Sequence, residues 1–207
     1  MNIIARFLFF IIISSAFFSC KNEGKSTIEN VDNDSKESLI VPVSIPEKKE
    51  LTTKLEDQVN SVMVKSMVTP DLKTFTSMLV TVGLVDMLSK QEGPFTIIGP
   101  SNEAFTRLGQ FQLNELLNTA NKDELIRLIK SHVIEGNLDS TTLVQKIKEG
   151  KGSYEIVSMS GTTYTVSREG TEIFITDVKG VAAQIGKSDV KAANGVLHLL
   201  DKVLGMN

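Results

Sequence analysis

The chain has 207 residues, with 22 Lys and Arg against 25 Asp and Glu and a formal net charge of −3. This length allows one domain of ordinary size, with residues left for targeting and tethering. The chain has no excess of basic residues, so its charge does not predict nucleic acid as a partner. The single cysteine, Cys20, excludes an internal disulfide.

The N-terminus has the pattern of a secretory signal peptide over residues 1–19. Arg6 supplies a positive charge, and the apolar run Phe7 to Phe18 is shorter than the roughly 20 residues that span a bilayer. Ser19-Cys20 then resembles a bacterial lipobox, which implies a bacterial source and an acylated Cys20. The alternatives are a free thiol after an ordinary cleavage site, or an uncleaved anchor.

Residues 20–50 are predicted to be a flexible tether between Cys20 and a globular domain over residues 51–207. The tether is polar, with scattered aliphatic residues, and Pro42 and Pro46 disfavour helix. A flexible stretch of this length would let the domain stand about 30 Å away from its anchor.

Two amphipathic helices are predicted to open the domain. The first covers residues 51–68, with an apolar stripe at helical spacing (Leu55, Val59, Val62, Met63 and Met67). The second runs from Phe75 to Leu88, through Gly83. Met residues of these helices (Met63, Met67, Met78 and Met87) would line a pocket if the protein carried a small molecule, but at helical spacing they favour a core.

A short apolar strand, Phe95 to Ile98, is predicted to stop at Gly99-Pro100 and lead into a helix. Ser101 is a suitable N-cap, and Glu103 falls at the positive end of the helix dipole. Asn102 and Glu103 could contact a ligand, but orientation of the strand-to-helix turn explains them sufficiently.

Another helix is expected to begin at a capping box formed by Asn121 and Glu124 and to end at Gly136 in an αL cap. His132 falls on its apolar stripe, which favours a buried, hydrogen-bonded side chain. A further short helix is predicted over residues 140–149.

From Tyr154 onward the apolar period changes to two, which predicts an antiparallel meander through residue 175. A strand within residues 178–185 and a hairpin follow. Asn194-Gly195 is typical of a type I′ turn. The residues after it, up to Leu204, are apolar almost throughout and predict a strand covered on both faces. His198 is expected in the core, near a backbone carbonyl or Asp201.

Catalytic and metal-binding patterns are not found. His132 and His198 have no second ligand at metal-binding spacing, so neither a metal nor a cofactor is expected. Ser131 and His132 are adjacent in a predicted helix, where side chains point about 100° apart. The sequence also lacks a Gly-x-Ser-x-Gly elbow and phosphate-binding loops. We therefore predict that the protein is not an enzyme.

Three segments resemble the fasciclin domain family. They are the strand and helix start Thr96 to Phe105, the segment Leu128 to Gly136, and the closing segment Asn194 to Leu204. The family often places Tyr before the central His, whereas this chain has Ser131. The residues that we identify as structural determinants through this resemblance are Pro100, Asn102, Glu103, Phe105, His132, Asn194, Gly195, His198 and Asp201.

The resemblance covers roughly residues 55 to 206 and implies an α+β fold, a wedge of antiparallel and mixed strands flanked by helices. It also implies adhesion or attachment through a protein or glycan ligand, without a cofactor. With the lipobox, it predicts a lipid-anchored module of the bacterial envelope, at the cell surface or facing the periplasm. The alternatives are an envelope structural protein that binds a partner protein and, less favoured, a small-molecule carrier.

Overall fold

The computed structural model describes residues 47–206, with side chains from residue 52 onward. The predicted signal peptide, Cys20 and the tether up to residue 46 lie outside the described residues. Helix α1 (Glu47–Val59) includes the last residues of the predicted tether. No helix in the described part is long and apolar enough to cross a bilayer.

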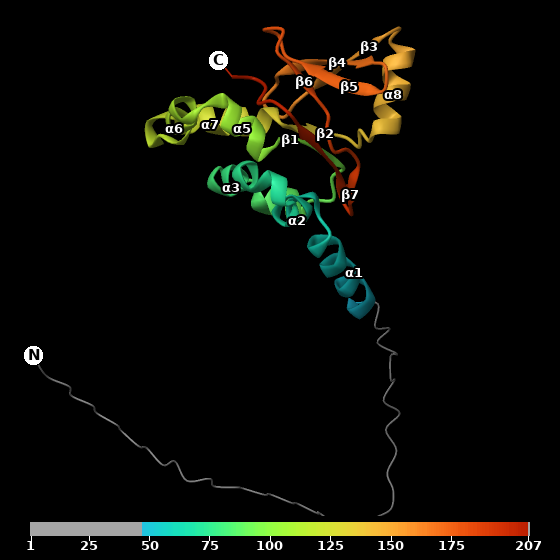
Figure 1. Cartoon of the computed structure of the whole chain (residues 1–207). Coiled ribbons are helices and arrows are strands. Elements are labelled where there is room, and N and C mark those ends of the chain that lie inside the picture. Colours follow the sequence, from blue (N-terminus) through green and yellow to red (C-terminus); the bar gives the residue numbers. More distant parts are fainter. Residues whose placement is uncertain (1–46, 207) are drawn as a thin grey trace, which may run out of the picture. The chain divides into compact units, whose positions relative to one another are not determined.

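Short helices dominate the first half of the described chain, and strands dominate the second (Figure 1). The further helices are α2 (Val62–Val68), α3 (Lys73–Thr81), α4 (Val85–Lys90), α5 (Asn102–Leu108), α6 (Gln110–Leu117), α7 (Lys122–Ser131) and α8 (Ser140–Glu149), with 3-10 turns η1 (Pro70–Leu72) and η2 (Thr119–Asn121). The strands are β1 (Phe95–Pro100), β2 (Val133–Glu135), β3 (Ser153–Val157), β4 (Thr163–Glu169), β5 (Glu172–Thr176), β6 (Ala182–Gln184), β7 (Val190–Ala192) and β8 (Gly195–Leu200). The predicted α+β class is confirmed.

The first sheet has the order β2-β1-β8-β7 and is mixed. Strands β1 and β8 are parallel, from Phe95 beside Gly195 to Pro100 beside Leu200. This register places two sequence motifs, which lie far apart in the chain, in neighbouring strands. Five of the six residues of β8 are buried, so the predicted strand covered on both faces is confirmed, but it ends at Leu200 and not at Leu204.

The second sheet is the antiparallel meander β3-β4-β5-β6. The predicted meander is confirmed, and so is the helix over residues 140–149. The strand predicted within residues 178–185 is only Ala182–Gln184, because a turn over residues 177–181 precedes it.

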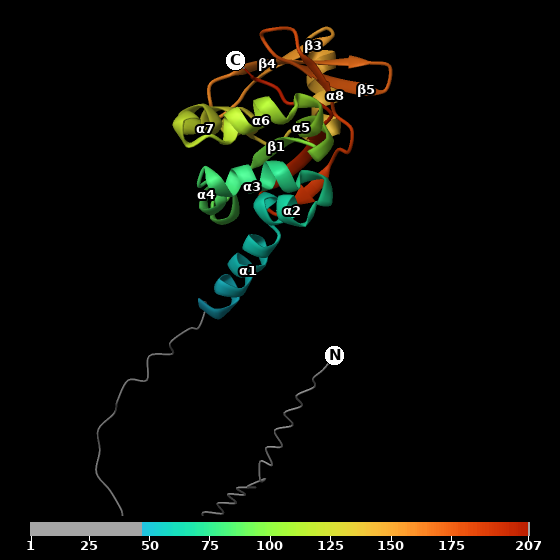
Figure 2. The same cartoon turned by 60° about the vertical axis from the view of Figure 1, so that its left-hand side comes forward.

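The first sheet separates two apolar clusters, with the helical layer on one side and the second sheet with α8 on the other (Figures 1 and 2). Successive residues of β1 alternate between them: Ile97 packs with α2 to α7, and Ile98 with the meander and α8. Leu199 and Leu200 of β8 alternate in the same way. The alternation follows from the period of two of a strand.

The two predicted opening helices are each divided in the structure. The chain breaks at Ser61, which has extended φ/ψ and caps α2 by accepting a hydrogen bond from Val64 N–H. Leu55 and Val59 are consequently exposed, and the single helix over residues 51–68 is wrong. The second helix ends before Gly83, which has φ +77° and provides the left-handed conformation that closes α3.

Three predicted ends are also wrong. Strand β1 runs through Gly99 and Pro100, since its hydrogen-bonded register with β8 continues to Leu200. Asn121 makes no side-chain cap for α7; its amide donates to Glu115 O instead. Helix α7 ends at Ser131 rather than at Gly136, because residues 133–135 pair with β1.

The hairpin before β8 is present, but its turn differs from the prediction. Ala192 pairs with Gly195, so the loop consists of Ala193 and Asn194. Asn194 has no positive φ, and Gly195 is the first residue of the strand with φ +149°. The type I′ turn at Asn194-Gly195 is therefore wrong, and these residues have other roles.

Candidate functional site

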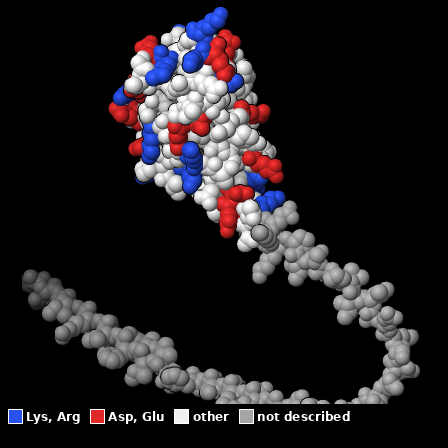
Figure 3. Space-filling view, turned by 90° about the vertical axis from the view of Figure 1, so that its right-hand side faces the viewer, with Lys and Arg blue, Asp and Glu red and all other residues white. Residues whose placement is uncertain are grey.

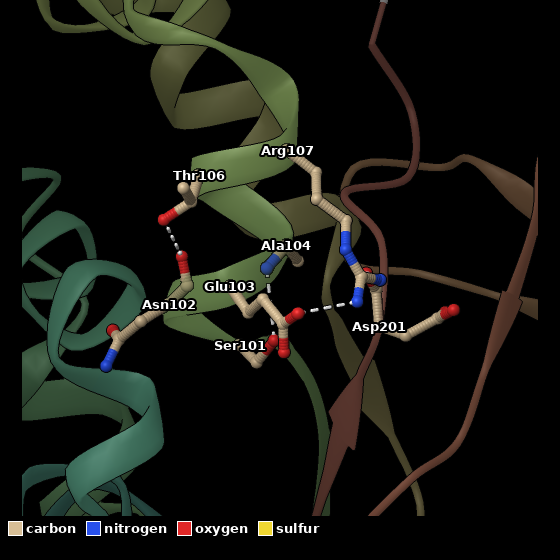
Figure 4. A network of polar contacts seen from close by, with 7 residues as sticks. All are labelled: Ser101, Asn102, Glu103, Ala104, Thr106, Arg107 and Asp201. Atoms are coloured by element: carbon tan, nitrogen blue, oxygen red, sulfur yellow. Dashed lines mark hydrogen bonds and ion pairs between the residues drawn. The ribbon is translucent and has the colours of Figure 1, made fainter.

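The first sequence motif forms a strand-to-helix turn fixed by local polar contacts (Figure 4). Ser101 Oγ accepts a hydrogen bond from Ala104 N–H at 3.1 Å, which confirms the predicted N-cap. Asn102 accepts from Thr74 N–H at 3.0 Å and donates to Pro70 O at 2.9 Å, so it joins α5 to the η1 turn. Both contacts are to other parts of the domain, which supports a structural role for Asn102.

Glu103 and Arg107 form an exposed ion pair on α5, with 2.7 Å between Oε1 and Nη2. Arg107 also donates to Asp201 O at 3.3 Å, and this contact joins α5 to the end of β8. The Asp201 carboxylate accepts from Gln184 N–H at 2.7 Å. Exposed pairs of this kind contribute little to stability. Phe105, by contrast, is only 2% exposed and belongs to the core.

Asn194 connects three segments from a buried position. Its Oδ1 accepts from Val62 N–H at 2.8 Å, and its Nδ2 donates to Leu88 O and Gln91 O, each at 3.0 Å. The side chain therefore satisfies a donor at the start of α2 and acceptors at the end of α4. Gly195 is required by space, since a Cβ there would lie 1.8 Å from Phe95 O.

His198 is fully buried and hydrogen-bonded through both ring nitrogens. Its Nε2 donates to Leu138 O at 2.8 Å, and its Nδ1 accepts from Asp189 N–H at 3.3 Å. Burial lowers the pKa of His198, and the Asp189 and Asp139 carboxylates oppose that shift. The predicted backbone carbonyl is thus confirmed, whereas Asp201 as the neighbour is wrong, because Asp201 is bonded to β6.

His132 is also a buried neutral imidazole. Its Nδ1 lies 2.9 Å from Leu128 O and its Nε2 accepts from Leu204 N–H at 3.4 Å, which places the proton on Nδ1. Burial lowers its pKa to about 4. The ring packs edge-on against Phe75, 5.7 Å between centroids. The predicted burial of His132 is confirmed.

Neither histidine is placed to act as a general base. The expectation that Ser131 and His132 do not meet is wrong: Ser131 Oγ lies 3.3 Å from His132 Nδ1, since the helix ends between the two residues. Ser131 Oγ, however, donates to Leu128 O at 2.7 Å, and the ring nitrogen that faces it carries a proton. Ser140 is bonded to the Asp189 carboxylate, not to His198.

The structure divides the four methionines named for a carrier pocket. Met63 and Met78 are fully buried in the core, Met87 packs at its border, and Met67 is exposed. Three of them therefore belong to one core, and the fourth faces solvent. Among the described residues, no group of three or more His, Cys, Asp or Glu side chains could hold a metal ion.

A small groove of about 150 Å³ lies between α7, the turn over residues 177–181 and the C-terminal segment. Asp177 organises the turn: its Oδ1 accepts from Lys179 N–H and Val181 N–H, each at 2.9 Å. Its Oδ2 accepts from Gly205 N–H at 3.3 Å, which ties the turn to the C-terminal segment. The turn is therefore a fixed feature of the groove.

The edge of the groove is apolar and basic. Val178 is 82% exposed at the tip of the turn, beside Lys179, and Arg127 of α7 lines the opposite side. Lys179 Nζ donates to Met206 O at 2.9 Å. The one carboxylate among the residues that line the groove, that of Asp177, accepts from backbone amides. Arg127 Nη2 lies 4.0 Å from Glu124 Oε1 on the same helix, so of the two cations only Lys179 has no ion pair in the described part of the chain.

Two hydroxyls lie beneath the groove. A Cβ at Gly205 would be 3.0 Å from the Tyr164 hydroxyl and 3.1 Å from Ser131 Oγ, so the glycine lets the chain pass directly over both. The Tyr164 hydroxyl is buried without a hydrogen-bond partner in the described part of the chain, and burial raises its pKa. Sequence reasoning missed Asp177, Val178 and Lys179. The Asp-x-x-Gly pattern of residues 177–180 was the available signal for a turn.

One apolar cluster lies between the two sheets, and helices cover the other face of the mixed sheet. This arrangement places the domain in the α+β class. The fasciclin domain model matches residues 70–206, and the chain belongs to this family. The solved structure of a FAS1 domain pair from the insect cell adhesion molecule fasciclin I has the same fold, with a TM-score of 0.52 and 24% identity. That match covers 65% of this chain and 45% of the other.

Relatives occur in bacteria and animals. Protein sll1483 of the cyanobacterium Synechocystis is 28% identical over 134 residues, which are 64% of this chain and 67% of that protein. Human periostin is 27% identical over 65% of this chain, and Drosophila fasciclin-1 is 30% identical over 54%. The matches cover only 14% of periostin and 17% of fasciclin-1, so this chain corresponds to one part of those proteins.

Proposed function

We propose that this protein is a lipid-anchored adhesion module outside the cytoplasm, which binds a protein or glycan partner and catalyses no reaction. Family membership supports a binding role, since its relatives include a protein described as a cell adhesion molecule. The anchor would be Cys20, with the tether up to residue 46 as the spacer. The described domain would then be the part that reaches the partner.

The observation that carries the proposal is the groove beside α7. An apolar side chain that is almost fully exposed on a turn fixed by hydrogen bonds can be buried against a partner, which removes its apolar surface from water. Val178 has this placement, and Arg127 and Lys179 add positive charge on either side. We infer that the partner supplies an apolar pocket next to an acidic group. On the face shown in Figure 3, by contrast, acidic and basic side chains are interspersed.

Binding of the purified protein to matrix proteins, glycans and whole cells tests the proposal, with the heat-unfolded protein as control. Val178→Asp should weaken saturable binding about tenfold or more, as for a central interface residue. Val80→Asp is the matched control, since Val80 is half exposed on α3. Equal loss in both variants would contradict the groove as the site. No binding across the panel would favour an envelope partner instead.

The anchor and its location need separate experiments. Cys20→Ala should abolish incorporation of radiolabelled fatty acid and release the protein from the membrane fraction. Protease added to intact cells should remove the domain if it faces the exterior, whereas protection until the outer membrane is permeabilised would support the periplasmic alternative. Retention of the label in Cys20→Ala would refute lipidation at this residue.

A further inference from the structure

The two sheets have four edge strands, and three of them are bonded in part or packed against a neighbouring element. The outward groups of β6 are occupied: Gln184 N–H by the Asp201 carboxylate, Gln184 O by Asp201 N–H, and Ala182 O by Lys202 Nζ. On β2, Val133 O accepts from Met159 N–H at 2.8 Å. Strand β7 packs beside α2, and the next residue, Ala193, donates to Asn60 O at 2.9 Å.

Strand β3 is different. Ser158 N–H donates to Thr162 O at the end of the β3–β4 pair, and bonded positions alternate along an antiparallel ladder. Tyr154 and Ile156 therefore bond to β4, whereas Glu155 and Val157 direct their N–H and C=O groups outward. Within residues 47–206, no hydrogen bond to the outward groups of Glu155 or Val157 is formed.

The side chains along this edge give little protection against strand addition. Natural edge strands are commonly blunted by Pro, by charged side chains (especially Lys) or by a bulge. The sequence of β3, Ser-Tyr-Glu-Ile-Val, has no Pro or Lys, and Glu155 is its one charged side chain. Val157 is 58% exposed, and Tyr154 is half-buried. The edge is therefore accessible and favourable for a β-strand.

Glu155 indicates the chemistry of the added strand. Its side chain is exposed, its cross-strand neighbour on β4 is the uncharged Thr165, and in the described part of the chain it forms no ion pair. At the position directly opposite Glu155 on an added strand, a positively charged residue would be stabilising, whereas a negatively charged residue would be destabilising. Self-pairing of two copies centred on Glu155 would place the two carboxylates opposite each other.

We propose that the free edge of β3 is a docking site for an extended segment of a partner protein, with Lys or Arg opposite Glu155 and a β-branched residue opposite Val157. Antiparallel addition would form two bonds with each of these residues and extend the second sheet by one strand. The site shares no residue with the groove beside α7, so either proposal can fail while the other holds.

The probe is the acetylated, amidated peptide Thr-Val-Thr-Lys-Val-Thr, whose Lys would face Glu155. Titration of the purified protein, followed by NMR amide shifts, should show saturable changes along β3. A peptide with Glu in place of Lys should bind about tenfold more weakly, and Glu155→Lys should reverse this preference. Methylation of the peptide's Lys backbone nitrogen should abolish binding, because it removes a ladder donor.

Val157→Pro is the matching change in the protein, because it removes the backbone N–H of Val157, which points outward. Proline removes only this free donor, as edge strands tolerate. The melting temperature should therefore stay close to that of the unchanged protein. Binding of the N-methylated peptide at full strength, or shifts confined to other elements, would overturn the proposal. A dimer of the free protein that Val157→Pro dissolves would also overturn it, because the occupant would then be a second copy.

Discussion

Asn194→Ala is expected to destabilise the domain strongly, although it alters a single loop residue. The side chain is 7% exposed and serves two helix ends at once. Its removal leaves the buried Val62 N–H without an acceptor and withdraws the donor shared by Leu88 O and Gln91 O. Alanine offers no group to replace these bonds.

The magnitude follows from the cost of unsatisfied buried groups. A buried donor or acceptor that loses its partner costs about 1–3 kcal/mol. Asn194→Ala leaves one donor and two acceptors without a partner, and one of these acceptors, Gln91 O, is only partly buried. The expected loss is roughly 3–5 kcal/mol, a large share of the 5–15 kcal/mol that is the usual free energy of unfolding. The melting temperature should fall by roughly 10 °C for a domain of this size.

Urea unfolding followed by circular dichroism measures this change. Asn114→Ala is the matched control, since Asn114 is exposed and only accepts from the Gln110 side chain, so its loss should be within about 0.5 kcal/mol. Asn194→Asp keeps the acceptor but turns an anionic oxygen toward two carbonyls, and should be at least as unstable at pH 7. A loss below about 1 kcal/mol in Asn194→Ala would refute the three-bond role of this side chain.

Three further predictions concern the glycine, the core and pH. Gly195→Ala should cost about 2–6 kcal/mol in urea unfolding, because its Cβ would overlap Phe95 O in a backbone conformation that alanine resists. Gly161 lies in open space, so Gly161→Ala should cost only about 1 kcal/mol. Equal effects of the two changes would contradict the close approach of Gly195 to Phe95. Phe105→Ala should cost about 3–5 kcal/mol, and a loss near zero would place the ring outside the core. The pKa of His132 is about 4 in the folded state and about 6.5 in the unfolded state, so the unfolded chain binds more protons between these pH values. The free energy of unfolding should therefore fall by roughly 3 kcal/mol as the pH falls from 6.5 to 4. An NMR titration of the imidazole should show no midpoint near pH 6.5, and one there would refute its burial as a neutral group.

Local signals predicted the elements whose formation depends on neighbouring residues. Ser101 caps α5 because its hydroxyl reaches the first turn of its own helix. The meander follows from the apolar period of two, and helix α8 from its stripe and from Gly150. The burial of His132 and His198 could also be predicted, since both interrupt apolar patterns.

Contacts between distant segments decided the rest. Asn194-Gly195 has the composition of a type I′ turn, but the helix ends at Val62 and Leu88 use the Asn side chain, and Phe95 O excludes any Cβ at the glycine. The same holds for residues 133–135, which pair with β1 instead of continuing α7.

The sequence by itself determined the fold class, the main strands and the family, because these depend on periodicity and on motifs within short segments. Only the tertiary structure decided which side chains remain accessible. The groove at Val178 and the free edge at Glu155 exist because of what their neighbours leave uncovered. Exposure of this kind is a property of the packed molecule, and no local pattern of residues encodes it.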